Sequence, residues 1–265
     1  MVLKILLIIA VLILIEIYFE TNFPKIAIVN IKTKKIKTQK KIKVLQITDY
    51  HNFKYSSRVL KIVREAQPDM IVITGDLIDK VTKDYSNVYR FVKELVNINP
   101  NVYYVSGNHE FKSGNMDMFL EGVARQNIGV LINSNLTVTF QGNAINICGI
   151  DYSSTKMGDL NKTVQGIDTS LFTILLCHKP DIVKEQKSIP CDLLLCGHTH
   201  GGQIRFPLLG AAIAPDQGLL PKYNKGLYKI DNDTILYIDS GVGTTRLPVR
   251  FMNRSQISFI EIEKE

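Results

Sequence analysis

The chain has 265 residues, of which 45% are apolar, and its formal net charge is +7. A chain of this length and apolar content can bury a substantial core, and an α/β domain of this size commonly folds as one unit. A net charge of +7 would ordinarily suggest a nucleic acid or an anionic surface as partner. The position of that charge along the chain therefore decides which partners are excluded.

The net positive charge comes from the first part of the chain. Residues 1–43 contain nine lysines against two glutamates, which accounts for the whole net charge, and residues 44–265 are neutral. A groove that binds a nucleic-acid backbone usually gives its domain a basic excess, so nucleic acid is not an expected partner. The lysines instead suit anionic lipid headgroups, at about 1 kcal/mol each, or form a solvated charged segment.

The N-terminal segment predicts a membrane anchor. Every residue from Ile5 to Ile15 is apolar, and after Glu16 the apolar stretch continues for three residues. A bilayer core needs roughly 17 to 25 helical residues, which this segment approaches if Lys4 and Glu16 extend toward the interfaces. A cleaved signal peptide is the alternative, but no small-x-small cleavage site follows the apolar run. We therefore expect an uncleaved single-pass anchor over residues 1–20.

Two features bear on membrane topology and point in opposite directions. The positive-inside rule places the lysine-rich flank, and hence the main domain, in the cytoplasm. An N-terminal anchor with a short basic tip more often exports the chain that follows it. We expect a protein of the cell membrane with its main domain on the extracytoplasmic side. After the anchor, we expect a basic membrane-proximal segment over 21–42, which could contain an edge strand at Ile26–Ile31. The main domain would then cover residues 43–265.

Short apolar runs that end at polar residues predict buried strands. The runs are Lys43–Thr48, Met70–Thr74, Val102–Val105, Ile145–Ile150, Phe172–Cys177 and Leu193–Cys196. Helical patterns lie between the early runs, at Ser56–Ala66, Tyr85–Asn97 and Gly114–Gln126. The first half of the domain therefore follows a β-α-β order, which favours parallel strands.

The later runs suggest a second sheet. Gly226–Ile230, Thr234–Asp239 and Ile257–Ile262 follow one another with few helical residues between them, which favours antiparallel pairing. The expected fold is therefore α/β, a four-layer α/β/β/α sandwich of two mixed sheets. The four cysteines lie in or beside apolar runs and form no CxxC pair, so we expect free buried thiols.

Polar clusters follow the predicted strands at their carboxyl ends, where ligands bind in open α/β sheets. The clusters are Asp49-Tyr-His51, Gly75-Asp76-Leu-Ile-Asp79, Gly107-Asn108-His109-Glu110, His178, and Gly197-His198-Thr-His200. The chain has five histidines, and all five fall within these clusters. Any one of them alone would more safely be read as a structural histidine, but the whole set predicts a metal site.

The ligand types narrow the choice of ion. Imidazole, carboxylate and amide oxygens without thiolate suit Mn, Fe or Zn better than a purely oxygen-ligated Ca or Mg site. The seven candidate ligands are Asp49, His51, Asp76, Asn108, His178, His198 and His200. Seven exceed what one ion needs from the protein, so we expect two divalent ions that share Asp76.

The ordered motifs D-x-H, GDxxD, GNH(D/E), a lone His and GHxH resemble the calcineurin-like metallophosphoesterases across roughly residues 43–203. The resemblance implies a first metal on Asp49, His51, His200 and Asp76, and a second on Asp76, Asn108, His178 and His198. The stretch from Gly218 to Phe251 also resembles the membrane-anchored bacterial branch of this family. Tyr50 departs from the family pattern, where an aliphatic residue more often stands, and this bears on substrate fit rather than on metal binding.

His109 is the candidate general acid, consistent with the resemblance, because it adjoins Asn108 but is outside the expected ligand set. Asp79 or Glu110 could orient it, and a helix-capping or surface role is an equal alternative for both. Candidate substrate-binding residues are Asn108, His109 and Arg246. Arg250 could also contact phosphate, since arginine binds it bidentately, or could be structural.

These features predict a metal-dependent hydrolase of phosphate esters or anhydrides, of phosphodiesterase or pyrophosphatase type. Two metal ions can activate a bridging water for attack on phosphorus. The anchor favours a membrane-associated or nucleotide-linked lipid substrate, although a phosphate-containing small molecule also fits. The alternatives are a phosphomonoesterase or phosphoprotein phosphatase, and a non-catalytic scaffold.

Overall fold

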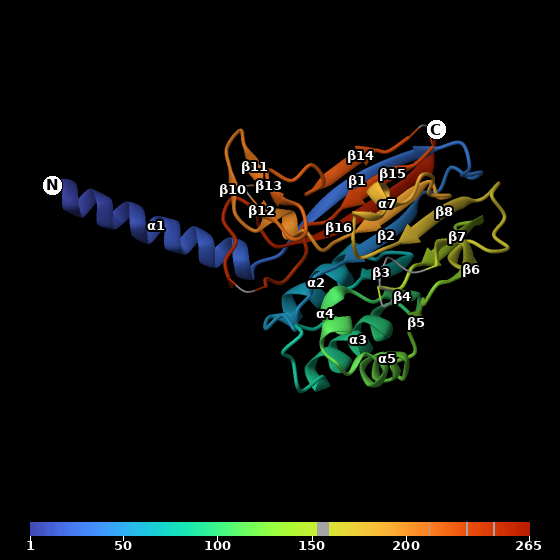
Figure 1. The fold of residues 1–265 in the computed structure, drawn as a ribbon, viewed down its shortest axis with the longest axis horizontal. Helices are drawn as coiled ribbons and strands as arrows, with labels where there is room; N and C mark the ends of the chain where they lie inside the picture. The colour runs from blue at the N-terminus through green and yellow to red at the C-terminus, as the bar shows by residue number, and fades with distance from the viewer. Residues whose placement is uncertain (153–158, 212, 232, 246) are drawn as a thin grey trace.

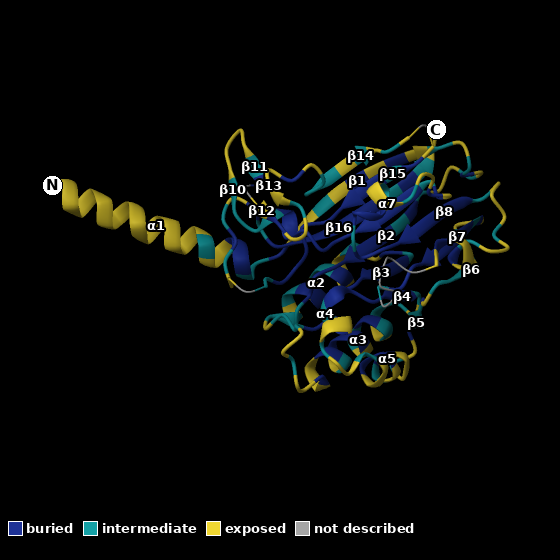
Figure 2. Cartoon of the chain, in the orientation of Figure 1, coloured by how far each residue is buried: buried dark blue, intermediate teal, exposed yellow. Residues whose placement is uncertain are grey.

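The structure is a computed structural model, and it describes residues 1–152, 159–211, 213–231, 233–245 and 247–265. An isolated helix, α1 (Val2–Asn22), projects from a compact body (Figure 1). An 18-residue window of α1 has a mean hydropathy of 2.8, and none of that window is buried (Figure 2). Its 21 residues span about 31 Å at 1.5 Å per residue, which matches the thickness of a bilayer core.

The first sheet combines strands from both ends of the chain. Its order is β1 (Lys25–Thr33), β16 (Gln256–Lys264), β2 (Ile42–Ile47), β3 (Met70–Thr74), β4 (Val102–Val105) and β5 (Gly129–Val130). Only the pairing of β16 with β2 is antiparallel. We expected the run at Ile257–Ile262 in the second sheet, and that expectation is wrong. The run forms β16, which fills the gap between the edge strand β1 and β2.

The second sheet has the order β14 (Gly226–Lys229), β15 (Ile235–Ile238), β9 (Leu193–Cys196), β8 (Phe172–Leu176), β7 (Asn143–Gly149) and β6 (Ser134–Phe140). Its central strands β15, β9, β8 and β7 are parallel, and antiparallel pairing occurs only at the two edges. The parallel centre places the carboxyl ends of β8 and β9 side by side. The loops that follow β8 and β9 therefore lie next to each other at this end of the sheet.

Three helices cover the outer face of the first sheet: α2 (Ser56–Ala66), α3 (Ser86–Ile98) and α5 (Met116–Ala124). In α2 the apolar residues Val59, Leu60 and Val63 recur at helical spacing and are buried. The second sheet is covered by the one-turn helices α6 (Leu160–Thr163) and α7 (Ile182–Glu185). Apolar clusters lie between the two sheets and on each outer face (Figure 2). The predicted four-layer α/β/β/α sandwich is therefore confirmed.

The cysteines lie in the core. All four of them are free and buried, and they belong to the apolar cluster on the outer face of the second sheet.

A further segment follows the 3-10 helix η1 (His200–Gly202) and lies outside the two large sheets. It contains two small hairpins, β10 (Arg205–Phe206) with β11 (Gly210–Ala211), and β12 (Ile213–Ala214) with β13 (Gly218–Leu219). We call residues 204–211 and 213–220 the flap. Figure 1 shows the flap at the end of the body from which α1 projects.

The basic segment runs away from α1. Strand β1 begins at Lys25, next to the end of α1, and the loop that follows it lies near the C-terminus at the opposite end of the body (Figure 1). There Lys41 lies 2.8 Å from Glu261 and Lys35 lies 2.9 Å from Asp192. A nine-residue strand carries the chain about 30 Å, so the lysines that follow β1 lie far from α1.

Candidate metal centre

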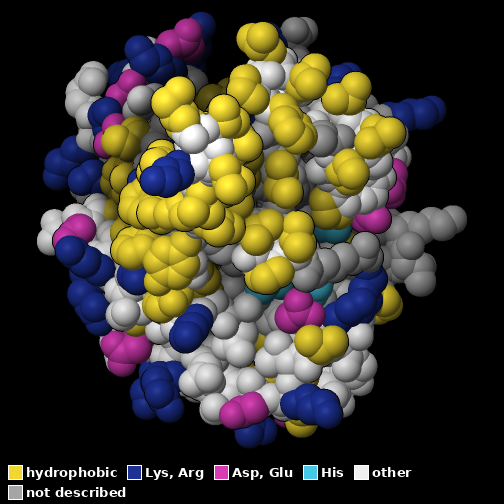
Figure 3. Space-filling model, turned by 90° about the vertical axis from the view of Figure 1, so that its left-hand side faces the viewer, with side chains coloured by type: hydrophobic (Ala, Val, Ile, Leu, Met, Phe, Trp, Pro, Cys, Tyr) yellow, Lys and Arg dark blue, Asp and Glu magenta, His cyan; other side chains and the backbone are white. Residues whose placement is uncertain are grey.

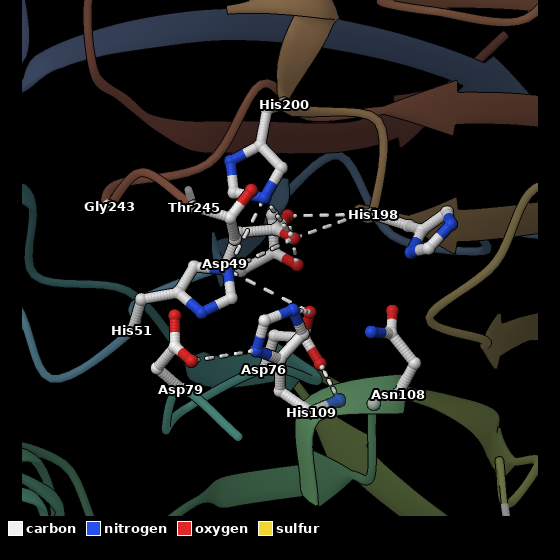
Figure 4. Close-up of polar contacts among 12 residues, drawn as sticks. Asp49, His51, Asp76, Asp79, Asn108, His109, His198, His200, Gly243 and Thr245 are labelled. Carbon is white, nitrogen blue, oxygen red and sulfur yellow. Dashed lines mark hydrogen bonds and ion pairs between the residues drawn. The ribbon is translucent and has the colours of Figure 1, made fainter. Parts of the chain in front are cut away.

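The polar clusters converge at one end of the sandwich, although they come from both sheets (Figure 4). Asp49 and His51 follow β2, Asp76 follows β3, Asn108 and His109 begin α4 (Asn108–Lys112) after β4, His178 follows β8, and His198 and His200 follow β9. The two sheets pack face to face, so their strand ends form one site between them.

Five candidate ligands have backbone angles in the left-handed region, where residues other than glycine rarely occur. They are Asp49, His51, Asp76, His198 and His200, with φ between 49° and 70°. Such angles cost of order 1 to 3 kcal/mol each and persist where the surrounding structure enforces them. Clusters of such angles are typical of functional sites.

Two glycines allow the loops to approach each other closely. A Cβ atom on Gly75 would lie 2.6 Å from Nδ1 of His178, and one on Gly107 would lie 2.2 Å from Oδ1 of Asp76. Both separations are shorter than van der Waals contact. The glycines of the GDxxD and GNH motifs therefore give the side chains room to meet.

The candidate ligands form two compact groups. In the first, ligand atoms of Asp49, His51 and His200 lie within 4.8 Å of one another. In the second, ligand atoms of Asp76, His178 and His198 do the same.

Asp76 belongs to the second group and also lies close to the first. Its Oδ2 atom is 3.2 Å from Nε2 of His178 and 3.7 Å from Nε2 of His51. Oδ1 of Asn108 lies 3.2 Å from the same nitrogen of His178. Ligand atoms of His51, Asp76 and His109 also lie within 4.8 Å of one another. Distance alone therefore does not distinguish His109 from the candidate ligands.

Backbone carbonyls fix the orientation of two of the imidazole rings. Nδ1 of His51 lies 3.1 Å from the carbonyl of Ile78, and Nδ1 of His178 lies 2.8 Å from the carbonyl of Thr74. A carbonyl only accepts hydrogen bonds, so each Nδ1 carries a proton. In the neutral rings Nε2 then presents a lone pair to the centre of the site, which is the arrangement of metal-binding histidines.

The charge balance of the site also suits cations. Burial lowers the pKa of His51 to about 4, which keeps this ring neutral. Burial alone would lower the pKa of His178 as well, but the carboxylates of Asp76 and Asp49 raise it to about 10. The buried carboxylates therefore attract positive charge, which divalent ions would supply.

His109 faces the same space from α4 (Figure 4). Its Nδ1 accepts the backbone N–H of Lys80 at 3.0 Å, so the proton of the neutral ring lies on Nε2. The carboxylate of Asp79 lies 3.5 Å from Nδ1, which places Asp79 beside the ring. The backbone N–H of His109 donates to Asp76 at 2.8 Å and ties the two residues together.

Glu110 is a buried structural carboxylate, one of the alternatives that the sequence left open. One oxygen accepts the N–H groups of Leu77 and Ile78, at 2.6 and 3.2 Å, and the other accepts those of Gly107 and Asp76, at 2.7 and 3.0 Å. Glu110 thus holds together the two loops that carry Asp76 and Asn108.

Sequence reasoning missed Asp216 because it lies in the flap, outside the recognised motifs. Its Oδ2 lies 3.0 Å from Nε2 of His198 and 2.8 Å from the amine of Lys179. Nδ1 of His198 is 3.2 Å from His178 and faces the site. By accepting a hydrogen bond from the Nε2–H group, Asp216 leaves Nδ1 free to bind a metal.

Arg246 and Arg250 are the two arginines that the sequence suggested for contact with phosphate. Arg246 lies outside the residues that the structure describes. Arg250 is fully buried, and its guanidinium donates to the carbonyls of Ser240 and Gly243 at 2.7 and 2.6 Å. Arg250 is therefore structural, which is one of the two roles that the sequence left open.

A cavity of about 710 Å³ opens in front of the site. It is bounded on one side by Asp79, Lys80, His109 and Lys112, and on the other by flap residues that include Ile213 and Asp216. The floor contains the candidate ligands Asp76, Asn108, His198 and His200.

Residues 42–202 match the family model for calcineurin-like phosphoesterases, and the chain belongs to this family. The protein is therefore a hydrolase of phosphate esters, of a family that uses divalent metal ions, and the resemblance seen in the motifs is confirmed.

The chain is similar to several proteins of known sequence. It is 30% identical over 220 residues to the uncharacterized metallophosphoesterase YkuE of Bacillus subtilis, covering 82% of this chain and 76% of YkuE. It is 32% identical over 240 residues to an uncharacterized metallophosphoesterase of Helicobacter pylori, covering 85% and 61%. It is also 30% identical over 221 residues to a zebrafish transmembrane protein with a metallophosphoesterase domain, covering 78% and 48%. The chain thus spans between about half and three quarters of these relatives, and its apolar helix fits a membrane anchor.

Proposed function

We propose that the protein is a two-metal hydrolase of phosphodiesters or diphosphates whose substrate is a membrane-associated or nucleotide-linked lipid. The observation that carries this proposal is the pair of ligand groups on either side of Asp76, in a domain that is joined to an apolar helix. The first ion would be held by Asp49, His51, Asp76 and His200, and the second by Asp76, Asn108, His178 and His198. The imidazole-rich donor set favours Mn, Fe or Zn.

The proposed mechanism assigns separate roles to the side chains. When bound, two such ions neutralise phosphate oxygens and lower the pKa of the attacking water. His109 donates its Nε2 proton to the leaving oxygen, because Nδ1 is occupied by the N–H of Lys80. Asn108 and His109 flank the phosphate from one side, and the backbone N–H of His109 keeps Asp76 in place.

The shape and charge of the cavity support a substrate larger than a phosphate monoester. A volume of about 710 Å³ is in the range of cavities that hold a small organic molecule. Lys80 and Lys112 line its rim, where they attract phosphate groups. The neutral charge of residues 44–265 argues against a nucleic-acid backbone as substrate.

The test compares two chromogenic substrates on the full-length protein in lipid nanodiscs, after metal removal and after addition of Mn or Zn. We expect metal-dependent cleavage of bis(p-nitrophenyl) phosphate that exceeds cleavage of p-nitrophenyl phosphate and is lost in Asp76→Asn. Faster cleavage of the monoester would favour the phosphomonoesterase alternative. No cleavage of either substrate by the metal-loaded protein would favour a scaffold.

A further inference from the structure

The flap exposes an unusual number of large apolar side chains. Those that are at least 47% exposed are Phe206, Leu208, Leu209, Ile213, Leu219 and Leu220. The surface of a water-soluble domain rarely gathers apolar side chains in this way, and such a patch usually marks contact with a partner or a membrane.

The flap and α1 lie on the same face of the molecule. Figure 3 views that face, and the apolar side chains of α1 and of the adjoining surface form neighbouring patches. Histidine side chains are visible in a hollow directly below them. The hollow is the cavity of about 710 Å³ in front of the candidate metal centre, because flap residues 213–216 and 218 form one of its walls. We call it the catalytic cavity.

The last turn of α1 is fixed to the body by buried contacts. The carboxylate of Glu20 accepts the backbone N–H of Asn253 at 3.0 Å, and the hydroxyl of Thr21 accepts that of Arg250 at 2.9 Å. Only Phe23 and Pro24 separate α1 from β1. A bilayer that contains α1 therefore lies against the face that carries the flap.

A second, apolar cavity of about 520 Å³ extends from the catalytic cavity along the flap. Its walls include Ile204, Phe206, Ile213 and Leu247. The two cavities share the lining residues His200, Ile213, Pro215 and Thr245, so they lie next to each other. A phosphate ester with a hydrocarbon chain could place its phosphate in one and its chain in the other.

We propose that the flap inserts its apolar side chains into the interface of the bilayer that α1 enters, so that the catalytic cavity opens at the lipid surface. Continuity with α1 and with the apolar cavity favours a bilayer over a second copy of this chain as the occupant. Exposed leucine and phenylalanine side chains are the residues that insert at the acyl-chain boundary. The argument from the cavity rests on the proposed function, whereas insertion of the flap does not.

The chain has no tryptophan, so a single introduced tryptophan reports its own surroundings. The test uses Leu208→Trp in the full chain, reconstituted into vesicles of phosphatidylethanolamine and phosphatidylglycerol with brominated acyl chains. Met118→Trp is the matched control, because Met118 is 56% exposed on α5, in the helical layer away from α1 (Figure 1). We expect quenching of Leu208→Trp to be roughly twofold or more above that of the control.

Equal quenching of the two variants would overturn the proposal. A blue-shifted emission of Leu208→Trp that depends on protein concentration and not on brominated lipid would also overturn it, in favour of a second copy of the chain.

A second experiment separates this proposal from the proposed function. The double variant Leu208→Glu/Leu209→Glu is compared with Met118→Glu on a phosphodiester carried by vesicle lipid and on a soluble chromogenic diester. We expect the double variant to lose about tenfold in turnover of the vesicle substrate and none with the soluble diester. Equal losses on both substrates would contradict membrane insertion. If the unmodified protein cleaves neither diester, the proposed function fails, and the quenching result still decides on insertion.

Discussion

Oδ2 of Asp216 lies 3.0 Å from Nε2 of His198, which joins the flap to a candidate metal ligand. Because the hydrogen bond sets the tautomer of the ring, we predict that Asp216→Ala lowers affinity for the second metal by about 10- to 100-fold. Asp216→Asn keeps an oxygen that can accept the hydrogen bond from Nε2–H, so its affinity should fall less. Titration with a competing chelator measures both affinities, and an unchanged affinity in Asp216→Ala would contradict the role.

The position of Asp76 between the two ligand groups predicts a difference between two substitutions. Asp76→Asn removes a charge that both ions would share, so both should be lost. His178→Ala should lower occupancy of the second ion alone, and turnover with it. Elemental analysis of the purified proteins gives the metal content per chain. Full activity of a metal-depleted His178→Ala protein would refute the assignment.

His109 should affect turnover without affecting metal content. We predict that His109→Ala retains its metals and loses about 10²- to 10⁴-fold in kcat for an alkyl phosphodiester. The loss should be smaller for a nitrophenyl leaving group, which needs no proton. Loss of metal in this variant would instead make His109 a ligand, as its distance to Asp76 also allows.

Glu110 should govern stability. Each of its oxygens accepts two backbone N–H groups, so a glutamine in either orientation would direct its amide N–H₂ at two donors. We predict that Glu110→Gln lowers the free energy of unfolding by about 3 kcal/mol. Thermal unfolding checks this, with Glu121→Gln on the exposed face of α5 as the control. Equal melting temperatures of the two variants would contradict the structural role.

Lys225 should make stability depend on pH. Burial lowers its pKa to about 8, against the opposing effect of the Asp239 carboxylate. Below pH 8 the folded protein buries a charged amine. Between pH 8 and the ordinary lysine pKa of 10.5 the unfolded chain binds more protons than the folded protein, so stability rises with pH. The melting temperature relative to Lys225→Met should therefore increase over this range, and a constant difference would refute the shift.

Much of the fold was predictable because its signals are local. Apolar runs of four to six residues gave the central strands, and helical spacing gave α2, which begins and ends where we expected. The pairing of β16 was not predictable, because a strand's own residues do not specify between which strands it will lie. The distant position of the basic segment depends on the direction of β1, which only the assembled sheet defines.

The candidate site was predictable to the extent that its residues belong to motifs. All seven candidate ligands come together, and their role as ligands stays a prediction. Asp216 carries no motif and reaches His198 through the path of the flap. Likewise, nothing local distinguishes the buried Arg250 from an arginine that contacts substrate, because its carbonyl partners come from folding of the surrounding loop.

The link of two residues between α1 and β1, together with the hydrogen bonds of Glu20 and Thr21, couples the direction of the helix to that of the body. A transmembrane helix adjusts its tilt when its apolar length and the bilayer thickness differ. In an enzyme joined to its anchor by a flexible linker, a change of helix tilt would not change the orientation of the catalytic domain. Here any change of tilt would rotate the whole catalytic domain, so the acyl-chain length of the surrounding lipids would set the angle at which the cavity meets its substrate.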